Sequence, residues 1–119
     1  MLTDDGGLVF MSDPLRKINS CSDLVWQNDE DKFHHSIEQD GEGNIWVPGW
    51  MLPSVISTEK FGENYFDDAI YKVSQDGEII FQKSVSEIIM EDDMEYCSFP
   101  LGILMHFMLM SLISMIFNL

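Results

Sequence analysis

The stretch that decides the fold is Phe33-His34-His35-Ser36-Ile37-Glu38-Gln39-Asp40-Gly41-Glu42-Gly43-Asn44-Ile45-Trp46-Val47. Its acidic, glycine-rich tip at 40–44 supplies the positive-φ positions of a tight β-hairpin, and residues 45–47 form a β-rich return strand. Alternation along the first strand places His35, Ile37 and Gln39 on one face, and His34, Ser36 and Glu38 on the other. We therefore predict a hairpin whose two adjacent histidines point to opposite sides of a sheet.

A gapless internal repeat surrounds this hairpin. Residues 13–27 align on residues 68–82, an offset of 55 positions (68 minus 13). Each copy has an apolar strand with a lysine, a polar turn, and a strand that ends in an aromatic residue and Gln, which predicts a β-hairpin. Hairpins at this spacing are typical of radial repeats such as kelch-type blades of roughly 50 residues. Because a ring needs about four or more blades, we predict an all-β fragment, about two blades of a β-propeller.

Further elements are predicted around the repeat. Residues 8–10 are a predicted strand with no earlier segment to pair with. Residues 50–57 and 63–68 are predicted loops with aromatic anchors, since Pro53 disfavours a central strand. Ser84, with Glu87 three residues later, forms a predicted capping box for one or two turns of helix.

Composition narrows the classes of partner. The chain of 119 residues has 21 acidic and six basic residues, a formal net charge of -15. This charge opposes contact with phosphate backbones, so we predict that nucleic acid is not a partner. The two cysteines, Cys21 and Cys97, could form at most one disulfide and do not indicate a compartment.

The chain divides into two parts with different compositions. Residues 1–96 are acidic, aromatic and interrupted by turns, whereas residues 97–119 contain no Asp, Glu, Lys or Arg. The apolar tail at 99–119 is about as long as a membrane-spanning helix, which makes membrane association possible. No basic segment precedes it, and the N-terminus has neither a basic nor an apolar region, so no signal peptide is predicted in this chain.

The histidine pair is the candidate catalytic site. An imidazole titrates near neutral pH and can act as a nucleophile, a proton donor or a hydrogen-bond donor to developing charge. A surface pair with satisfied hydrogen bonds is an equally simple interpretation of His34 and His35. A metal site with Glu38 or Asp40 is disfavoured, because neighbouring strand side chains diverge. Asp40-x-Glu42-x-Asn44 lacks the rest of a calcium loop, and a turn explains it.

The order of these segments resembles the arylsulfotransferase (aryl-sulfate sulfotransferase) family over most of residues 2–95. The resemblance rests on the hairpin ending Leu-Val-Trp-Gln, on His34-His35-Ser36-Ile37 with its Asp-Gly-Glu-Gly-Asn-Ile-Trp tip, and on the second repeat copy. It implies a six-bladed propeller enzyme, periplasmic or secreted, that uses no nucleotide cofactor. Such an enzyme moves a sulfuryl group from a phenolic sulfate donor to a phenol acceptor through a histidine near the propeller axis. His35 then matches a supporting histidine, while Ser36 stands where the family usually has an acidic residue.

The resemblance also gives the tail a second interpretation. Read from the third base of each codon, residues 104–110 can encode Asp-Ala-Phe-His-Val-Asn, which resembles the family's next motif. The segment 97–119 is therefore either the product of a frameshift near residues 96–100 or a membrane-anchor-like helix.

Three functional classes remain open from the sequence. The chain is an arylsulfotransferase fragment that is inactive alone, a non-catalytic β-repeat binding module, or a small tail-anchored membrane protein. In the second class, the aromatic residues Trp26, Trp46, Trp50 and Tyr65 would serve packing or a partner.

Overall fold

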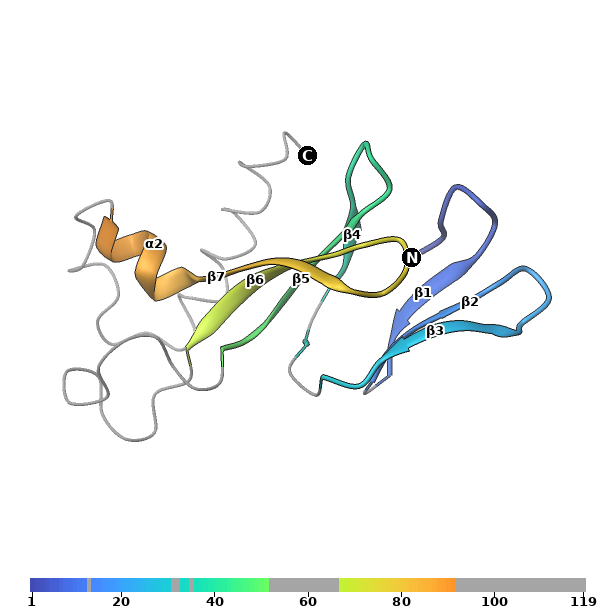
Figure 1. The fold of residues 1–119 in the computed structure, drawn as a ribbon, viewed down its shortest axis with the longest axis horizontal. Coiled ribbons are helices and arrows are strands. Elements are labelled where there is room, and N and C mark those ends of the chain that lie inside the picture. The colour runs from blue at the N-terminus through green and yellow to red at the C-terminus, as the bar shows by residue number, and fades with distance from the viewer. Residues whose placement is uncertain (13, 31–32, 35, 52–66, 92–119) are drawn as a thin grey trace.

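The computed structural model describes residues 1–12, 14–30, 33–34, 36–51 and 67–91. Two antiparallel sheets and one short helix make up this part of the chain (Figure 1). The first blade is a three-stranded sheet of β1 (Leu8–Met11), β2 (Leu15–Ile18) and β3 (Leu24–Asn28), in that order. The second blade is a four-stranded sheet in the order β4 (Glu38–Gln39), β5 (Ile45–Trp50), β6 (Asp68–Val73) and β7 (Ile79–Ser84), followed by α2 (Val85–Glu91). The predicted fold class, an all-β partial propeller, is confirmed.

The two repeat copies form the two predicted hairpins. In the first blade β2 pairs with β3, and Lys17 lies opposite Trp26. In the second blade β6 pairs with β7, and Lys72 lies opposite Phe81 at the same offset of 55 (72 minus 17). The register shifts immediately after each of these lysines. The repeat therefore preserves both the pairing and the irregularity of the hairpin.

Four turns with the same hydrogen bonding connect the strands. They cover residues 3–7, 19–23, 40–44 and 74–78, and in each the first N–H donates to the fifth carbonyl while the fourth N–H donates to the first. The fourth residue has a positive φ in every case: Gly6 80°, Ser22 69°, Gly43 84° and Gly77 87°. A left-handed residue at this position closes a three-residue hairpin loop, and glycine adopts it at the lowest cost.

The first of these turns corrects one prediction. Leu2 bridges Leu8, and the terminal amino group of Met1 donates to the carbonyl oxygen of Val9 at 2.7 Å. The strand at residues 8–10 therefore does have an earlier segment to pair with. The turn at 3–7 folds back as a hairpin because Gly6 takes the left-handed conformation, which the Asp-Gly signal alone did not locate.

The strand that was expected to carry the histidines is interrupted. Glu38 lies opposite Trp46, and Phe33 lies opposite Gly49. Between these two pairs the chain advances by five residues on the histidine side (38 minus 33) but by only three on β5 (49 minus 46). The predicted continuous strand from His34 to Gln39 is therefore wrong: among the described residues of this segment, only Glu38–Gln39 form a strand. Pro48 gives the reason: its carbonyl accepts from the His34 N–H at 3.0 Å, and a strand residue points its N–H to the same side as its carbonyl. Proline has no N–H, so the ladder loses a bond there.

The two blades dock through a tryptophan. Trp26 of β3 donates from Nε1 to the carbonyl of Gln75 at 2.8 Å, and Asn28 donates from Nδ2 to the carbonyl of Gly77 at 2.9 Å. A Cβ on Gly77 would lie 2.6 Å from Cδ2 of Trp26, so the ring rests directly on the glycine backbone. The core is shared between the blades: Val9, Leu15, Trp26, Ile45, Val47, Met51, Ala69, Tyr71 and Val73. The shared core and this contact hold the sheets side by side.

The helix begins at the predicted cap. The N–H of Glu87 donates to Oγ of Ser84 at 3.2 Å, which satisfies one of the free donors at the start of α2. Most of the two predicted loops and the whole tail at 97–119 lie outside the described residues. Among the residues that are described, no helix has the length and apolar composition needed to cross a membrane.

Three glycine substitutions test the docking of the blades. We expect Gly77→Ala to destabilise the fold by about 2 to 5 kcal/mol, because it adds a clash with Trp26 to the cost of a positive φ. Gly6→Ala should cost about 1 to 2 kcal/mol, since its φ is positive but no atom lies within 4 Å. Gly41→Ala, which has neither problem, should change stability by less than about 0.5 kcal/mol. Urea unfolding curves measure all three, and equal losses for Gly6 and Gly77 would contradict the contact.

Candidate active site

His34 is held at one end of the second blade. Its ring lies 5.2 Å from the Trp50 ring, between centroids, and its Nε2 lies 3.4 Å from Oδ1 of Asp68. Its side chain is 17% exposed, and that of Asp68 21%. His35, the other predicted site residue, lies outside the described residues, so its orientation stays a prediction.

Aromatic packing fixes the chain just before the histidine pair. Phe33 meets Tyr71 edge to face, with centroids 5.4 Å apart, and the Tyr71 hydroxyl donates to the carbonyl of Trp50 at 2.8 Å. Burial of Tyr71, together with the negative charges of Glu30 and Asp67, raises its pKa to about 12. The phenol therefore stays protonated at neutral pH and keeps its hydrogen bond. Trp50, which His34 contacts, is thus tied to a residue of the core.

The arrangement can orient an imidazole. A carboxylate near a ring nitrogen and an indole ring tilted at 43° beside the imidazole both restrict how the ring can turn. Trp50 and Asp68 lie directly opposite each other on β5 and β6. The sequence predicts loops at both residues, and this prediction is wrong: they are strand ends, and their register brings them together beside His34.

A second cluster of charges occupies the opposite end of the second blade. Lys72 Nζ lies 3.0 Å from Oδ2 of Asp40 and 5.3 Å from the centre of the Trp46 ring, and Trp46 donates from Nε1 to Asp40 at 3.1 Å. The other carboxylate oxygen of Asp40 accepts from the N–H groups of Glu42 and Asn44. The acidic tip is therefore a turn closed by its own side chain, as predicted.

Burial opposes the ionised form of Asp40, but these hydrogen bonds outweigh it. The bonds from Lys72, Trp46 and the two backbone N–H groups lower the pKa of Asp40 from 3.8 to about 2. Within the described ranges no group of three or more His, Cys, Asp or Glu residues could hold a metal ion. At this end Asp40 stabilises the turn at 40–44, and Asp40 and Glu42 pair with Lys72.

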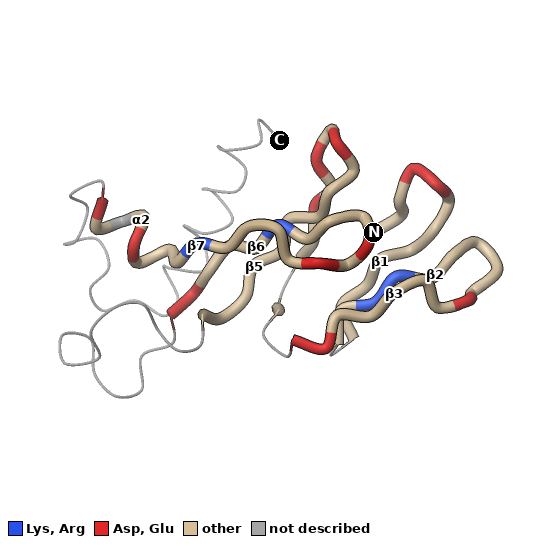
Figure 2. The backbone as a smooth tube through the Cα atoms, in the orientation of Figure 1, with Lys and Arg blue, Asp and Glu red and all other residues tan. Residues whose placement is uncertain are grey.

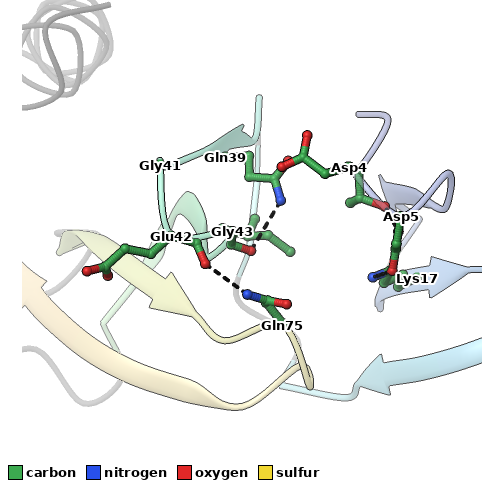
Figure 3. A pocket seen from close by; sticks show the side chains of 10 residues that line it. Asp4, Asp5, Lys17, Gln39, Gly41, Glu42, Gly43 and Gln75 are labelled. Carbon is green, nitrogen blue, oxygen red and sulfur yellow. Dashed lines mark hydrogen bonds and ion pairs between the residues drawn. The ribbon is translucent and has the colours of Figure 1, made fainter.

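A polar cleft of about 230 Å³ separates the turns of the two blades (Figure 3). Lys17 reaches Oδ2 of Asp5 at 2.6 Å on one wall, and on the other Gln75 donates to the carbonyl of Glu42 at 2.8 Å. The hydrogen bonds from Lys17 and Thr3 hold the pKa of Asp5 well below its usual range. The side chains of Asp5, Lys17, Gln39 and Gln75 are thus hydrogen-bonded within the cleft, and His34 is not among its lining residues.

Charge is segregated along the backbone (Figure 2). Half of the acidic residues in the described part lie in the four turns and the others lie on strands, in loops and in α2, whereas the basic residues lie on strands: Arg16, Lys17, Lys72 and Lys83. Three of these pair with carboxylates: Lys17 with Asp5, Lys72 with Asp40 and Glu42, and Lys83 with Glu91. The turn residues outside these pairs, Asp4, Asp23, Asp76 and Glu78, are exposed and add negative charge to the surface.

The predicted aromatic residues have packing roles where they are described. Trp26 joins the blades, Trp46 contacts Lys72 and Phe81, and Trp50 contacts His34. Tyr65 lies outside the described residues. The histidine end is therefore the part of the structure that combines an imidazole with an organised polar environment.

Comparison with known proteins relates this chain to a protein family. A family model described as Arylsulfotransferase (ASST) matches residues 1–106. Neither the search of curated proteins nor that of solved structures returned a match.

The Asp40 cluster predicts a pH dependence of stability. The folded-state pKa is depressed, so the carboxylate contributes stability that is fully present above about pH 4 and lost as pH falls towards 2. Asp40→Asn keeps the turn's acceptor oxygen but removes the charge. We expect it to cost about 1 kcal/mol at pH 7, after allowing for solvent screening, and almost nothing near pH 2. Urea unfolding at both pH values measures this; a difference that does not depend on pH would contradict the assignment.

Proposed function

The chain belongs to the arylsulfotransferase family, since the family model covers most of its length, and from this we propose that it is a fragment of an aryl-sulfate sulfotransferase. The complete enzyme would transfer a sulfuryl group from a phenolic sulfate ester to a phenol through a histidine intermediate. In the first step the S–O bond to the donor phenol breaks and an S–N bond to an imidazole forms. In the second step the acceptor phenol gives its proton to a base and its oxygen bonds to sulfur, while the S–N bond breaks and the imidazole leaves.

Two groups must be stabilised during this transfer. Negative charge develops on the equatorial sulfuryl oxygens and on the departing phenolate, and a proton has to reach that phenolate. Hydrogen-bond donors placed for the transition state accelerate such steps strongly. We assign His35 to this role, as a donor to the sulfuryl oxygens or as the general acid. His34 acts as a positioning residue for the segment.

The observation that carries the proposal is the interrupted strand at the histidine pair. Bulged strands redirect side chains and recur beside active sites. Between its pairing points at Phe33 and Glu38, the chain has two more residues than the facing stretch of β5. His34 lies in this segment and contacts Trp50 and Asp68. The family motif and the break in regular pairing thus fall on the same residues.

The fragment lacks most of the parts that catalysis needs. The described residues form two blades, and the strands close into no ring among them. The sulfuryl-carrying histidine would belong to another blade, so this chain alone should not turn over. We retain the division into residues 1–96 and an apolar segment at 97–119, with the segment proposed as a frameshift product and a membrane anchor as its alternative.

Sulfuryl transfer from a chromogenic aryl sulfate to a phenol tests the proposal. We expect no turnover from the chain as it stands, and activity when the reading frame after residue 96 is shifted so that the following blades are produced. In that restored protein, His35→Ala should lower the rate about 10² to 10⁴-fold, because it removes a transition-state donor. His34→Ala should have a smaller effect, and Ser36→Ala serves as the neighbouring control.

Two results would contradict the proposal. An unchanged rate for His35→Ala in the restored protein would remove this residue from the site. An encoding DNA whose alternate frame contains a stop codon, or lacks the His-Val-Asn triplet, would end the frameshift explanation of the tail and favour the anchor.

A further inference from the structure

The two blades carry the same row of side chains across their strands. In the first blade Val9, Lys17 and Trp26 lie opposite one another on β1, β2 and β3. In the second blade Trp46, Lys72 and Phe81 do so on β5, β6 and β7. The last two members of each row are related by the repeat offset of 55, and Val9 and Trp46 follow equivalent turns. We call these the first row and the second row.

The two rows differ sharply in exposure. The first row is buried, with Val9 0%, Lys17 7% and Trp26 9% exposed, and Trp26 is covered by the turn at 74–78 of the second blade. In the second row Phe81 is 44% exposed, and the Lys72 side chain is 20% exposed. Phe81 touches Trp46, with ring centres 5.7 Å apart, but its outer side faces solvent. The same surface is therefore an interface in one blade and open in the other.

The complementary surface is also open, on the first blade. In the second blade the surface that faces the first blade includes Ile45, Ile79 and the turn at 74–78. The equivalent positions in the first blade are Leu8, Leu24 and the turn at 19–23. Leu24 is 59% exposed, whereas its counterpart Ile79 packs against the core. We call Leu8, Leu24 and this turn the free face.

We propose that a second copy of this chain places its free face on the second row of the first copy, repeating the internal contact between the blades. Such head-to-tail contact is heterologous: one copy uses one surface and its partner uses the other. Both halves of an interface that already exists within the chain are present and exposed, so a second copy can continue it.

The residues that differ between the two blades at equivalent positions fit this contact. Trp26 needs a glycine beneath it and a carbonyl acceptor for its Nε1. At the equivalent position on the second row, Phe81 is a smaller ring without a donor. On the free face, the residue equivalent to Gly77 is Ser22, which keeps the left-handed backbone with φ 69° but carries a side chain. The smaller Phe81 ring would thus face the larger Ser22. Because the phenylalanine side chain has no N–H donor, the turn does not have to supply an acceptor.

The net charge of the chain determines the ionic strength at which two copies can associate. With a formal charge of -15, two copies repel each other at low ionic strength. The contact itself would bury the exposed side chains of Phe81 and Leu24, so salt should promote association by screening the repulsion between the net charges.

Sedimentation velocity on the full chain at high salt tests the proposal. Wild type should associate, while Phe81→Asp and Leu24→Asp should each raise the dissociation constant at least about tenfold, because each places a charge in the contact. Mixing the two variants should give a one-to-one dimer that grows no further, since each still has one intact surface. Far-UV circular dichroism verifies that each variant keeps the β fold.

Ile80→Asp is the matched control. Ile80 neighbours Phe81 and is 53% exposed, but its repeat counterpart Val25 remains 51% exposed although the second blade is docked. Its substitution should leave association unchanged.

Four results would overturn the proposal: a wild-type chain that stays monomeric at every salt concentration; association of Phe81→Asp as strong as wild type; loss of association in Ile80→Asp; or a mixture of the two folded variants that forms no dimer. The last result separates this contact from self-association through the apolar segment 97–119, which the Asp variants leave intact.

Discussion

The contact of Trp26 with the backbone of Gly77 is the constraint on which the two-blade structure depends. An indole ring can rest on a main-chain turn only where the turn carries no side chain, and Gly77 also needs the left-handed conformation that glycine adopts most easily. One residue therefore satisfies the turn and the docking at the same time. Because the ring donates to Gln75 as well, the contact fixes orientation and not merely proximity.

The sequence was informative wherever a local pattern determined the structure. The repeat at an offset of 55 predicted both hairpins, and the polar segment between the strands of each copy predicted its turn, because backbone conformation there follows from few residues. Ser84 was identified as a helix cap for the same reason. The partnership of Trp26 with Gly77 could not be read in this way, since it joins residues 51 positions apart (77 minus 26) in different sheets.

The histidine segment shows where local reasoning fails. Alternation predicted a regular strand, but Pro48 on the facing strand removes the N–H that regular pairing would need. The partners of His34 were missed for a related reason. Trp50 and Asp68 are adjacent only through the register of β5 and β6, and Asp68 stands in an acidic run that looks like a loop. The family resemblance, which depends on motif order, was unaffected by these errors.

The position of Gly77 against the Trp26 ring is the most direct test of the account, because it reports whether two adjacent blades are docked in solution. The α-proton chemical shifts of Gly77 in the isotope-labelled chain measure it. A ring directly above the glycine predicts shifts well upfield of the unstructured range, with nuclear Overhauser contacts to the indole. Unperturbed shifts and no such contacts, in a chain whose hairpins are formed, would contradict the two-blade structure.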